Sequence, residues 1–150
     1  MYFVNRDKIE STLRYMEKCL DIFHAQQSWE DPIVRLGLER ITHSIIESII
    51  DVGNSMIDGF IMRDPGSYED IIDILEDEKV LLETADAQAI REVVRLRKPL
   101  VLSYIAMNHE ELYEVLSKNL VALERFPSAV RHYLNKELGP VSAFLPKEDE

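Results

Sequence analysis

The chain has 150 residues, the length of a single domain, and 46% of them are hydrophobic, which excludes a disordered chain and supports one folded core. Its formal net charge of −11 excludes broad, nonspecific binding to nucleic acid or to an anionic membrane. Any contact with RNA must therefore come from a local basic patch, or from a surface that two chains form together.

The single cysteine, Cys19, excludes an internal disulfide framework and fits a reducing compartment. The N-terminus is already charged at Arg6, Asp7 and Lys8, which is unlike a signal peptide. No apolar run approaches the roughly 20 residues needed to span a bilayer. We therefore expect a cytoplasmic protein that does not associate with membranes.

The apolar pattern predicts five or six helices and no persistent strand. The first helix is expected over residues 5–27, where apolar side chains recur at steps of three and four. Asp31 followed by Pro32 is typical of a helix start, so the second helix should run from there to about Phe60. Its apolar residues form more than one stripe, which predicts a central helix buried by the bundle and by a further surface such as a second copy of the chain.

The second half of the chain contains the remaining helices. Ser67 with Asp70 three residues later resembles a capping box, and Pro99 should kink or restart a helix near Arg97. These helices are expected over 68–77, 84–105, 109–124 and 127–138. We therefore predict an all-α, up-down bundle of five to six helices, with one domain over 1–138 and a C-terminal tail over 139–150.

Metal and nucleophile sites find little support in the sequence. No two of the four histidines have the spacing of a zinc pair, and we interpret His43 and Glu47, one helical turn apart, as a hydrogen-bonded pair. Cys19 has apolar neighbours and is interpreted as a packed thiol. No glycine-rich phosphate loop is present. We therefore expect neither a metal nor another cofactor.

Glu47 and Asp51 share one face of the very apolar second helix. Two like charges on one face repel each other, so a cation from the fourth helix would relieve the cost. The alternative is that both carboxylates lie at the edge of the bundle.

A basic cluster, unusual in so acidic a chain, consists of Arg91, Arg95, Arg97 and Lys98. It could bind phosphate, because guanidinium and ammonium groups donate charge-assisted hydrogen bonds to phosphate oxygens. It could equally form surface ion pairs with neighbouring carboxylates. Charge alone does not decide between these two interpretations.

Four segments occur in an order and at intervals that are specific when taken together. They are Glu-Ser-Ile-Ile-Asp-Val-Gly at 47–53, Pro-Gly-Ser-Tyr-Glu-Asp-Ile at 65–71, Arg-Lys-Pro-Leu-Val-Leu-Ser-Tyr at 97–104 and Leu-Glu-Arg-Phe at 123–126. In these segments the chain resembles the HepT-like ribonuclease toxins of the HEPN superfamily, the partners of minimal nucleotidyltransferase antitoxins.

This resemblance implies a HEPN-like homodimer in which two subunits build one site that cleaves RNA without a metal. The family motif is Arg-Asn-x-Leu-Val-His-x-Tyr, whose arginine stabilises the phosphate, whose histidine moves protons and whose tyrosine receives AMP from the antitoxin. By resemblance, Arg97 and Tyr104 would be the catalytic pair and Tyr104 the modified residue. Arg91, Arg95 and Lys98 would bind RNA or a nucleotide.

The chain departs from this motif at its histidine, where Leu102 stands, and at its asparagine, where Lys98 stands. Leucine cannot transfer a proton, and loss of a general acid–base group costs about a hundred- to ten-thousand-fold in rate. Arg125 and His132 have a similar spacing, but such a match is expected by chance and falls in another helix.

Three functions follow from these observations. We expect a HepT-like protein with weakened or lost ribonuclease activity that binds a nucleotidyltransferase partner, a nucleotide or RNA. The first alternative is an active, metal-independent RNA endonuclease toxin. The second is a structural, dimeric helical bundle without a catalytic site.

Overall fold

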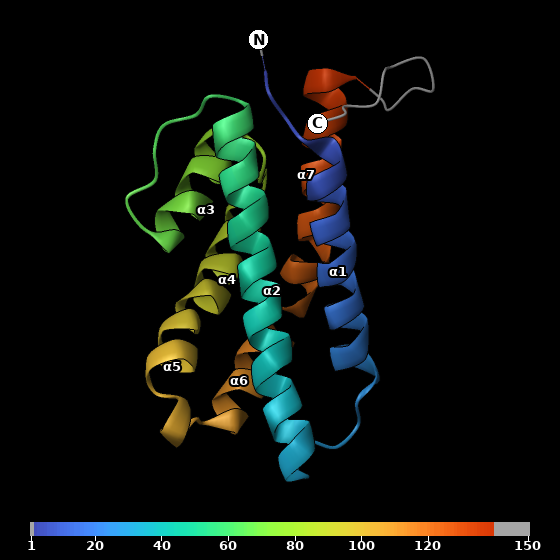
Figure 1. Cartoon of the computed structure of the whole chain (residues 1–150), viewed down its shortest axis with the longest axis vertical. Coiled ribbons are helices and arrows are strands. Elements are labelled where there is room, and N and C mark those ends of the chain that lie inside the picture. Colours follow the sequence, from blue (N-terminus) through green and yellow to red (C-terminus); the bar gives the residue numbers. More distant parts are fainter. Residues whose placement is uncertain (1, 140–150) are drawn as a thin grey trace.

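The computed structural model describes residues 2–139, which form seven α-helices and one 3-10 turn and no strand (Figure 1). In chain order they are α1 (Arg6–Ala25), α2 (Pro32–Gly59), α3 (Tyr68–Asp77), α4 (Thr84–Arg95), α5 (Arg97–Leu102), η1 (Tyr104–Ala106), α6 (His109–Lys118) and α7 (Leu120–Leu138). The all-α prediction is confirmed. Of the predicted tail, 140–150 lies outside the described residues.

Helix α2 is the central element of the bundle. It contacts α1, α3, α5 and α6, and Figure 1 shows it between α1 and α7 on one side and α3 to α5 on the other. Its start matches the prediction, since the Asp31 carboxylate accepts a hydrogen bond from the backbone nitrogen of Ile33 at 2.8 Å, with Pro32 as the first residue. Buried residues on several faces of α2 confirm the predicted central helix.

The hydrophobic core fills the space around α2 and includes the fully buried Met16, Ile45 and Phe126. Cys19 belongs to this core, because only 4% of it is exposed. Burial raises the pKa of its thiol, which keeps the sulfur in the unreactive protonated form. The interpretation of Cys19 as a packed thiol is confirmed.

The fourth predicted helix is divided at Leu96 into α4 and α5. Pro99 has no backbone N–H, so it is tolerated only in the first turn of a helix, and here it is the third residue of α5. The predicted restart near Arg97 is therefore confirmed. This restart places Arg97 at the beginning of a short helix that contacts α2.

The last two helices meet at Asn119, so the predicted start at Pro127 is wrong. The Asn119 amide donates hydrogen bonds of 2.9 Å to the Val115 carbonyl and to the Glu92 carboxylate, which fixes the break. Pro127 lies inside α7 with its ring buried next to Phe126. The packing of α7 on α4 outweighs the hydrogen bond that the proline cannot make.

Within residues 2–139, no helix combines the length and the apolar character needed to cross a membrane.

Candidate functional site

Arg97 lies where α5 meets α2. Its Nε donates a hydrogen bond of 2.9 Å to Oε2 of Glu47, and 27% of its side chain is exposed. This hydrogen bond raises the pKa of the Arg97 guanidinium, which stays protonated at every physiological pH. The junction between α2 and α5 therefore carries a permanent, partly solvent-exposed cation.

The aromatic ring of Tyr68 supports the guanidinium of Arg97 from the side of α3. The guanidinium carbon lies 4.4 Å from the centre of the ring, which is the geometry of a cation–π contact. Glu47 and Tyr68 come from two different helices and together restrict the side chain of Arg97. A cation held in this way loses little conformational entropy when it binds an anion.

The turn before α3 fixes the position of Tyr68. Ser67 caps α3 by accepting a hydrogen bond from the Asp70 backbone nitrogen at 3.0 Å, as predicted. Arg63 donates two hydrogen bonds, of 2.7 and 2.9 Å, to the Asp70 carboxylate, and the Gly66 backbone nitrogen donates another of 2.8 Å. Hydrogen bonding by Arg63 holds the pKa of Asp70 far below its usual range, so this network persists at neutral pH.

A groove of about 570 Å³ lies beside Arg97, between the start of α3 and the α4–α5 junction. Three of the four predicted basic residues line it, namely Arg95, Arg97 and Lys98. Its volume is within the range of small-molecule sites in proteins. We refer to it as the Arg97 groove.

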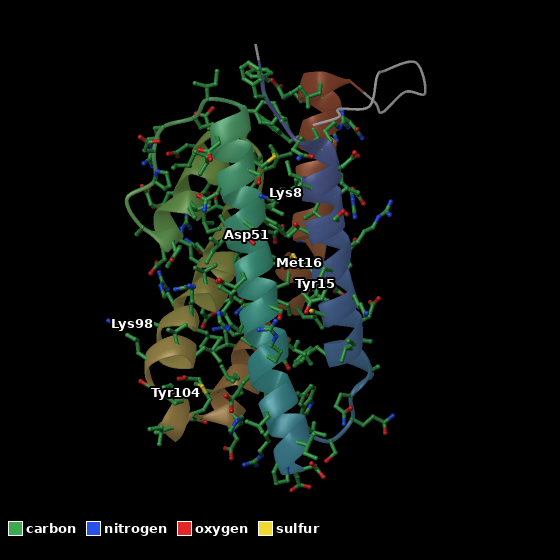
Figure 2. All side chains as sticks on the ribbon, in the orientation of Figure 1. Lys8, Tyr15, Met16, Asp51, Lys98 and Tyr104 are labelled. Carbon is green, nitrogen blue, oxygen red and sulfur yellow. The ribbon has the colours of Figure 1, made fainter. Side chains whose placement is uncertain are left out.

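The basic residues around the groove differ in how far carboxylates already neutralise them. Arg95 forms an exposed ion pair with Glu69 at 2.9 Å. Lys98 forms no ion pair within residues 2–139, and Figure 2 shows its side chain projecting outward from α5. Arg95 remains accessible to a ligand in the groove because exposed ion pairs are weak, and Lys98 remains accessible because no carboxylate described in the structure pairs with it.

Arg91 is not brought to the groove. It is bound by Asp73 at 2.7 Å and by Glu76 at 2.6 Å, and only 16% of its side chain is exposed. These two carboxylates compensate its charge and belong to α3. The structure therefore separates Arg91 from the other three cations.

A cation from the fourth predicted helix was expected to pair with the carboxylates of α2. In the structure this cation is Arg97, at the start of α5. It pairs with Glu47, whose side chain is 41% exposed, so the pair lies at the edge of the bundle. Asp51 is exposed on α2 and forms no ion pair within the described part of the chain (Figure 2).

Leu102 and Tyr104 lie at the end of α5 and the start of η1, where 67% and 64% of them are exposed. Leu102 lines the Arg97 groove. Tyr104 does not line the groove, and Figure 2 shows it at the far end of the α5–η1 segment from Lys98. Arg125 and His132 lie on α7 and do not line the groove either.

His43 is a residue at this junction that the motif comparison missed. Its Nε2 lies 3.8 Å from Oε2 of Glu47, the same oxygen that accepts the hydrogen bond from Arg97. This distance is too long for a hydrogen bond, and among residues 2–139 the buried Nε2 has no hydrogen-bond partner, so the predicted hydrogen-bonded pair with Glu47 is wrong. The four-residue spacing indicates that His43 and Glu47 share one face of a helix. The contact of Glu47 with Arg97 could be identified only from the folded structure.

Comparison with known proteins places this chain in a family. The ribonuclease HepT-like family model matches residues 9–130. "Putative RNase YutE" of Bacillus subtilis (strain 168) is 51% identical over 144 residues, which are 96% of this chain and 99% of that protein. The solved structure of cytosolic YutE from Bacillus subtilis has a TM-score of 0.91 at 51% identity and covers 96% of this chain and 100% of its own.

A more distant solved structure has the same fold. It is the tri-AMPylated Shewanella oneidensis HEPN toxin in complex with its MNT antitoxin, with a TM-score of 0.72 at 17% identity, covering 83% of this chain and 96% of that chain. The predicted HEPN-like fold is thereby confirmed. Since the family model spans most of the chain and YutE shares half of its residues, this protein belongs to the ribonuclease HepT-like family.

Proposed function

We propose that this HepT-like protein binds RNA phosphate in the Arg97 groove and that its ribonuclease activity is weak. The observation that carries the proposal is the state of Arg97. Within the described residues only its Nε is hydrogen-bonded, so both terminal nitrogens are left to donate to a phosphate. Arg95 and Lys98 add positive charge to the same groove.

The weak activity follows from Leu102, which lines the groove but cannot give or take a proton. An arginine can still bind and polarise a phosphate in such a site, so RNA binding is retained while the rate of cleavage falls.

Fluorescence anisotropy with a labelled single-stranded RNA at low salt tests this proposal. Truncation of Arg97→Ala removes a charge-assisted hydrogen bond of about 1.5–3 kcal/mol, so we expect the Kd to rise at least about tenfold. Arg125→Ala is the control, since it removes an arginine of the same charge on α7 that lies outside the groove and whose side chain is 62% exposed. Equal loss of affinity in the two variants, or none in either, would overturn the proposal.

We further propose that a nucleotidyltransferase antitoxin adds AMP to Tyr104. The support is its exposed position at the end of α5, together with the antitoxin complex formed by the structurally similar Shewanella toxin. Incubation with a minimal nucleotidyltransferase and ATP should add one or more AMP units in the mass spectrum. The addition should be absent in Tyr104→Phe and retained in Tyr113→Phe, a control of which 43% is exposed.

We also propose that the chain is a homodimer. Large apolar side chains are exposed along α5 and η1, and 88% of Ile105 is accessible. Such clusters mark interaction surfaces in soluble proteins. Light scattering should give twice the chain mass, and Ile105→Glu should give a monomer while Leu82→Glu, an exposed site between α3 and α4, should not.

A further inference from the structure

We infer that His43 is a catalytic residue that transfers the proton in RNA cleavage, and that its position at the α2–α5 junction compensates for the motif histidine replaced by Leu102. This inference rests on the proposed binding of RNA phosphate at Arg97. It assigns the remaining cleavage activity to a residue outside the family motif.

The first support is the position of His43 on α2. Arg40, His43 and Glu47 follow one another at steps of three and four, so they occupy one face of the helix. A hollow of about 220 Å³ adjoins this face and is lined by His43 and Arg40 together with Leu100 of α5. The imidazole therefore borders the space between α2 and α5. Leu100, which lines the same hollow, is three residues after Arg97, the first residue of α5.

The second support is the shared carboxylate oxygen of Glu47. Arg97 Nε lies 2.9 Å from it and His43 Nε2 lies 3.8 Å from it, so these two nitrogens are at most 6.7 Å apart. His43 lines a different hollow from the Arg97 groove, so the proposal requires the RNA backbone to extend from the phosphate bound at Arg97 to the imidazole. General base catalysis requires contact with the reacting hydroxyl, directly or through one water molecule.

The third support is the state of the imidazole itself. In the described part of the chain the buried Nε2 atom has no hydrogen-bond partner, although 32% of the side chain is exposed. Buried polar atoms without partners are rare in folded proteins, and a catalytic role is one reason for which they are kept. Glu47 favours the tautomer with the proton on Nε2, which leaves Nδ1 to accept a proton, and it stabilises the imidazolium that results.

The charges around His43 are mixed in sign. On α2 it has Glu47, Glu39 and Arg40 as neighbours, and on α5 it has Arg97. Glu39 is engaged by His109 of α6 at 2.6 Å, whereas Arg40 forms no ion pair within residues 2–139. Arg40 is thus a cation outside the Arg97 groove that is available to the RNA backbone.

The proposed reaction is a transesterification that needs no metal and no other reactant. His43 removes the proton from a ribose 2′-hydroxyl while that oxygen attacks the adjacent phosphorus, and Arg97 stabilises the charge that develops on the phosphate oxygens. The bond from phosphorus to the 5′-oxygen breaks, and the leaving oxygen takes a proton from water. The products are a 2′,3′-cyclic phosphate and a 5′-hydroxyl end, and His43 returns its proton to solvent.

The test measures cleavage and binding separately on the full chain, with an end-labelled RNA in a buffer containing EDTA. We expect the wild-type protein to form the cyclic phosphate slowly and His43→Asn to lower the rate about a hundredfold or more. The RNA Kd of His43→Asn should stay within about twofold of the wild-type value, since the three groove cations are unchanged. His132→Asn, an exposed histidine on α7, should cleave at the wild-type rate.

A second variant protects the test against misfolding. His43→Ala should regain part of its activity when free imidazole is added, which a purely structural role of His43 would not produce. Absence of cleavage by the wild-type protein, or equal rates for wild type and His43→Asn, would overturn the inference. If the wild-type protein does not bind RNA, this result would instead overturn the proposed RNA binding at Arg97.

Discussion

Arg97 and Glu47 are 50 residues apart in the sequence, and a hydrogen bond of 2.9 Å from Nε to Oε2 joins them. Glu47 restricts the guanidinium, but it also places a negative charge beside the expected position of an RNA phosphate. The same carboxylate lies 3.8 Å from His43. Glu47 should therefore oppose binding while it supports catalysis.

The variant Glu47→Gln separates these two effects. It keeps a hydrogen-bond acceptor for Arg97 and removes a charge whose repulsion of a phosphate 4 Å away is about 1 kcal/mol in water, so we expect RNA affinity to rise about fivefold. Cleavage should become slower, because the imidazolium of His43 loses the negative charge that lies 3.8 Å from its Nε2. Affinity comes from anisotropy titrations and rates from single-turnover assays.

Asp51→Asn is the control for Glu47→Gln. It removes a carboxylate from the same face of α2 that forms no ion pair within the described residues, so both affinity and rate should change little. Weaker binding in Glu47→Gln would show that the carboxylate acts mainly by positioning Arg97.

The parts of this fold that depend on neighbours in sequence could be predicted. Asp31 and Ser67 cap helices in the positions expected of them, and Pro99 restarts a helix near Arg97. Capping and proline effects act over a few residues and leave a readable pattern. The HEPN-like fold followed from such local signals together with the motif. A cation from the fourth helix was expected to pair with the α2 carboxylates, but only the structure identifies it as Arg97.

The features that could not be predicted depend on contacts between distant residues. Pro127 marks a helix start by local rules, but the buried face around Phe126 carries α7 through it. In the sequence, Arg91 and Arg95 belong to the same basic cluster. In the fold, two carboxylates of α3 pair with Arg91 and separate it from the groove. His43 joins the site only through Glu47 and the chain reversal that brings α5 onto α2.

Two glycines of α2 should respond oppositely to alanine. A methyl group at Gly53 would overlap the Ile71 side chain of α3, so overpacking should lower the stability by about 1–3 kcal/mol. Gly37 has open space around it, and Gly37→Ala should stabilise the protein by about 0.5–1 kcal/mol because alanine is the better helix former. Urea denaturation measures both changes. A stabilising Gly53→Ala would contradict the close packing of α2 on α3.

Stability should fall in acid through the contact between α1 and α7. Arg131 donates hydrogen bonds of 2.8–3.0 Å to Glu10 and Glu17, which lowers the pKa of both carboxyls from their ordinary value of 4.5. Carboxyls with a lowered pKa in the folded state stabilise it fully above pH 4.5, and this stabilisation is lost as the pH falls through the lower folded values.

Replacement of Arg131 should reduce this acid dependence. In Arg131→Met the two carboxyls lose their hydrogen-bond donor, so the free energy of unfolding should be lower at pH 7 and should change less between pH 7 and about pH 3. Urea titrations at a series of pH values measure the slope. The replacement Arg14→Met, which removes an exposed arginine of α1 that pairs with Glu10, should leave most of the slope in place. Equal slopes in wild type and Arg131→Met would assign the acid dependence to other groups.

Leu102→His would place an imidazole at the position where the resemblance to the family motif implies a histidine. Leu102 is 67% exposed and lines the Arg97 groove, so an imidazole fits there with little loss of packing. A general acid–base group contributes about a hundred- to ten-thousand-fold in rate, so we expect at least about a hundredfold faster RNA cleavage with little change in RNA affinity. Leu82→His is the matched control, because that leucine is also 67% exposed but lies outside the groove.

The gain should persist when His43→Asn is added, since the new imidazole transfers the proton from within the groove itself. An unchanged rate in Leu102→His would mean that RNA bound at Arg97 is not presented for cleavage on this side of α5.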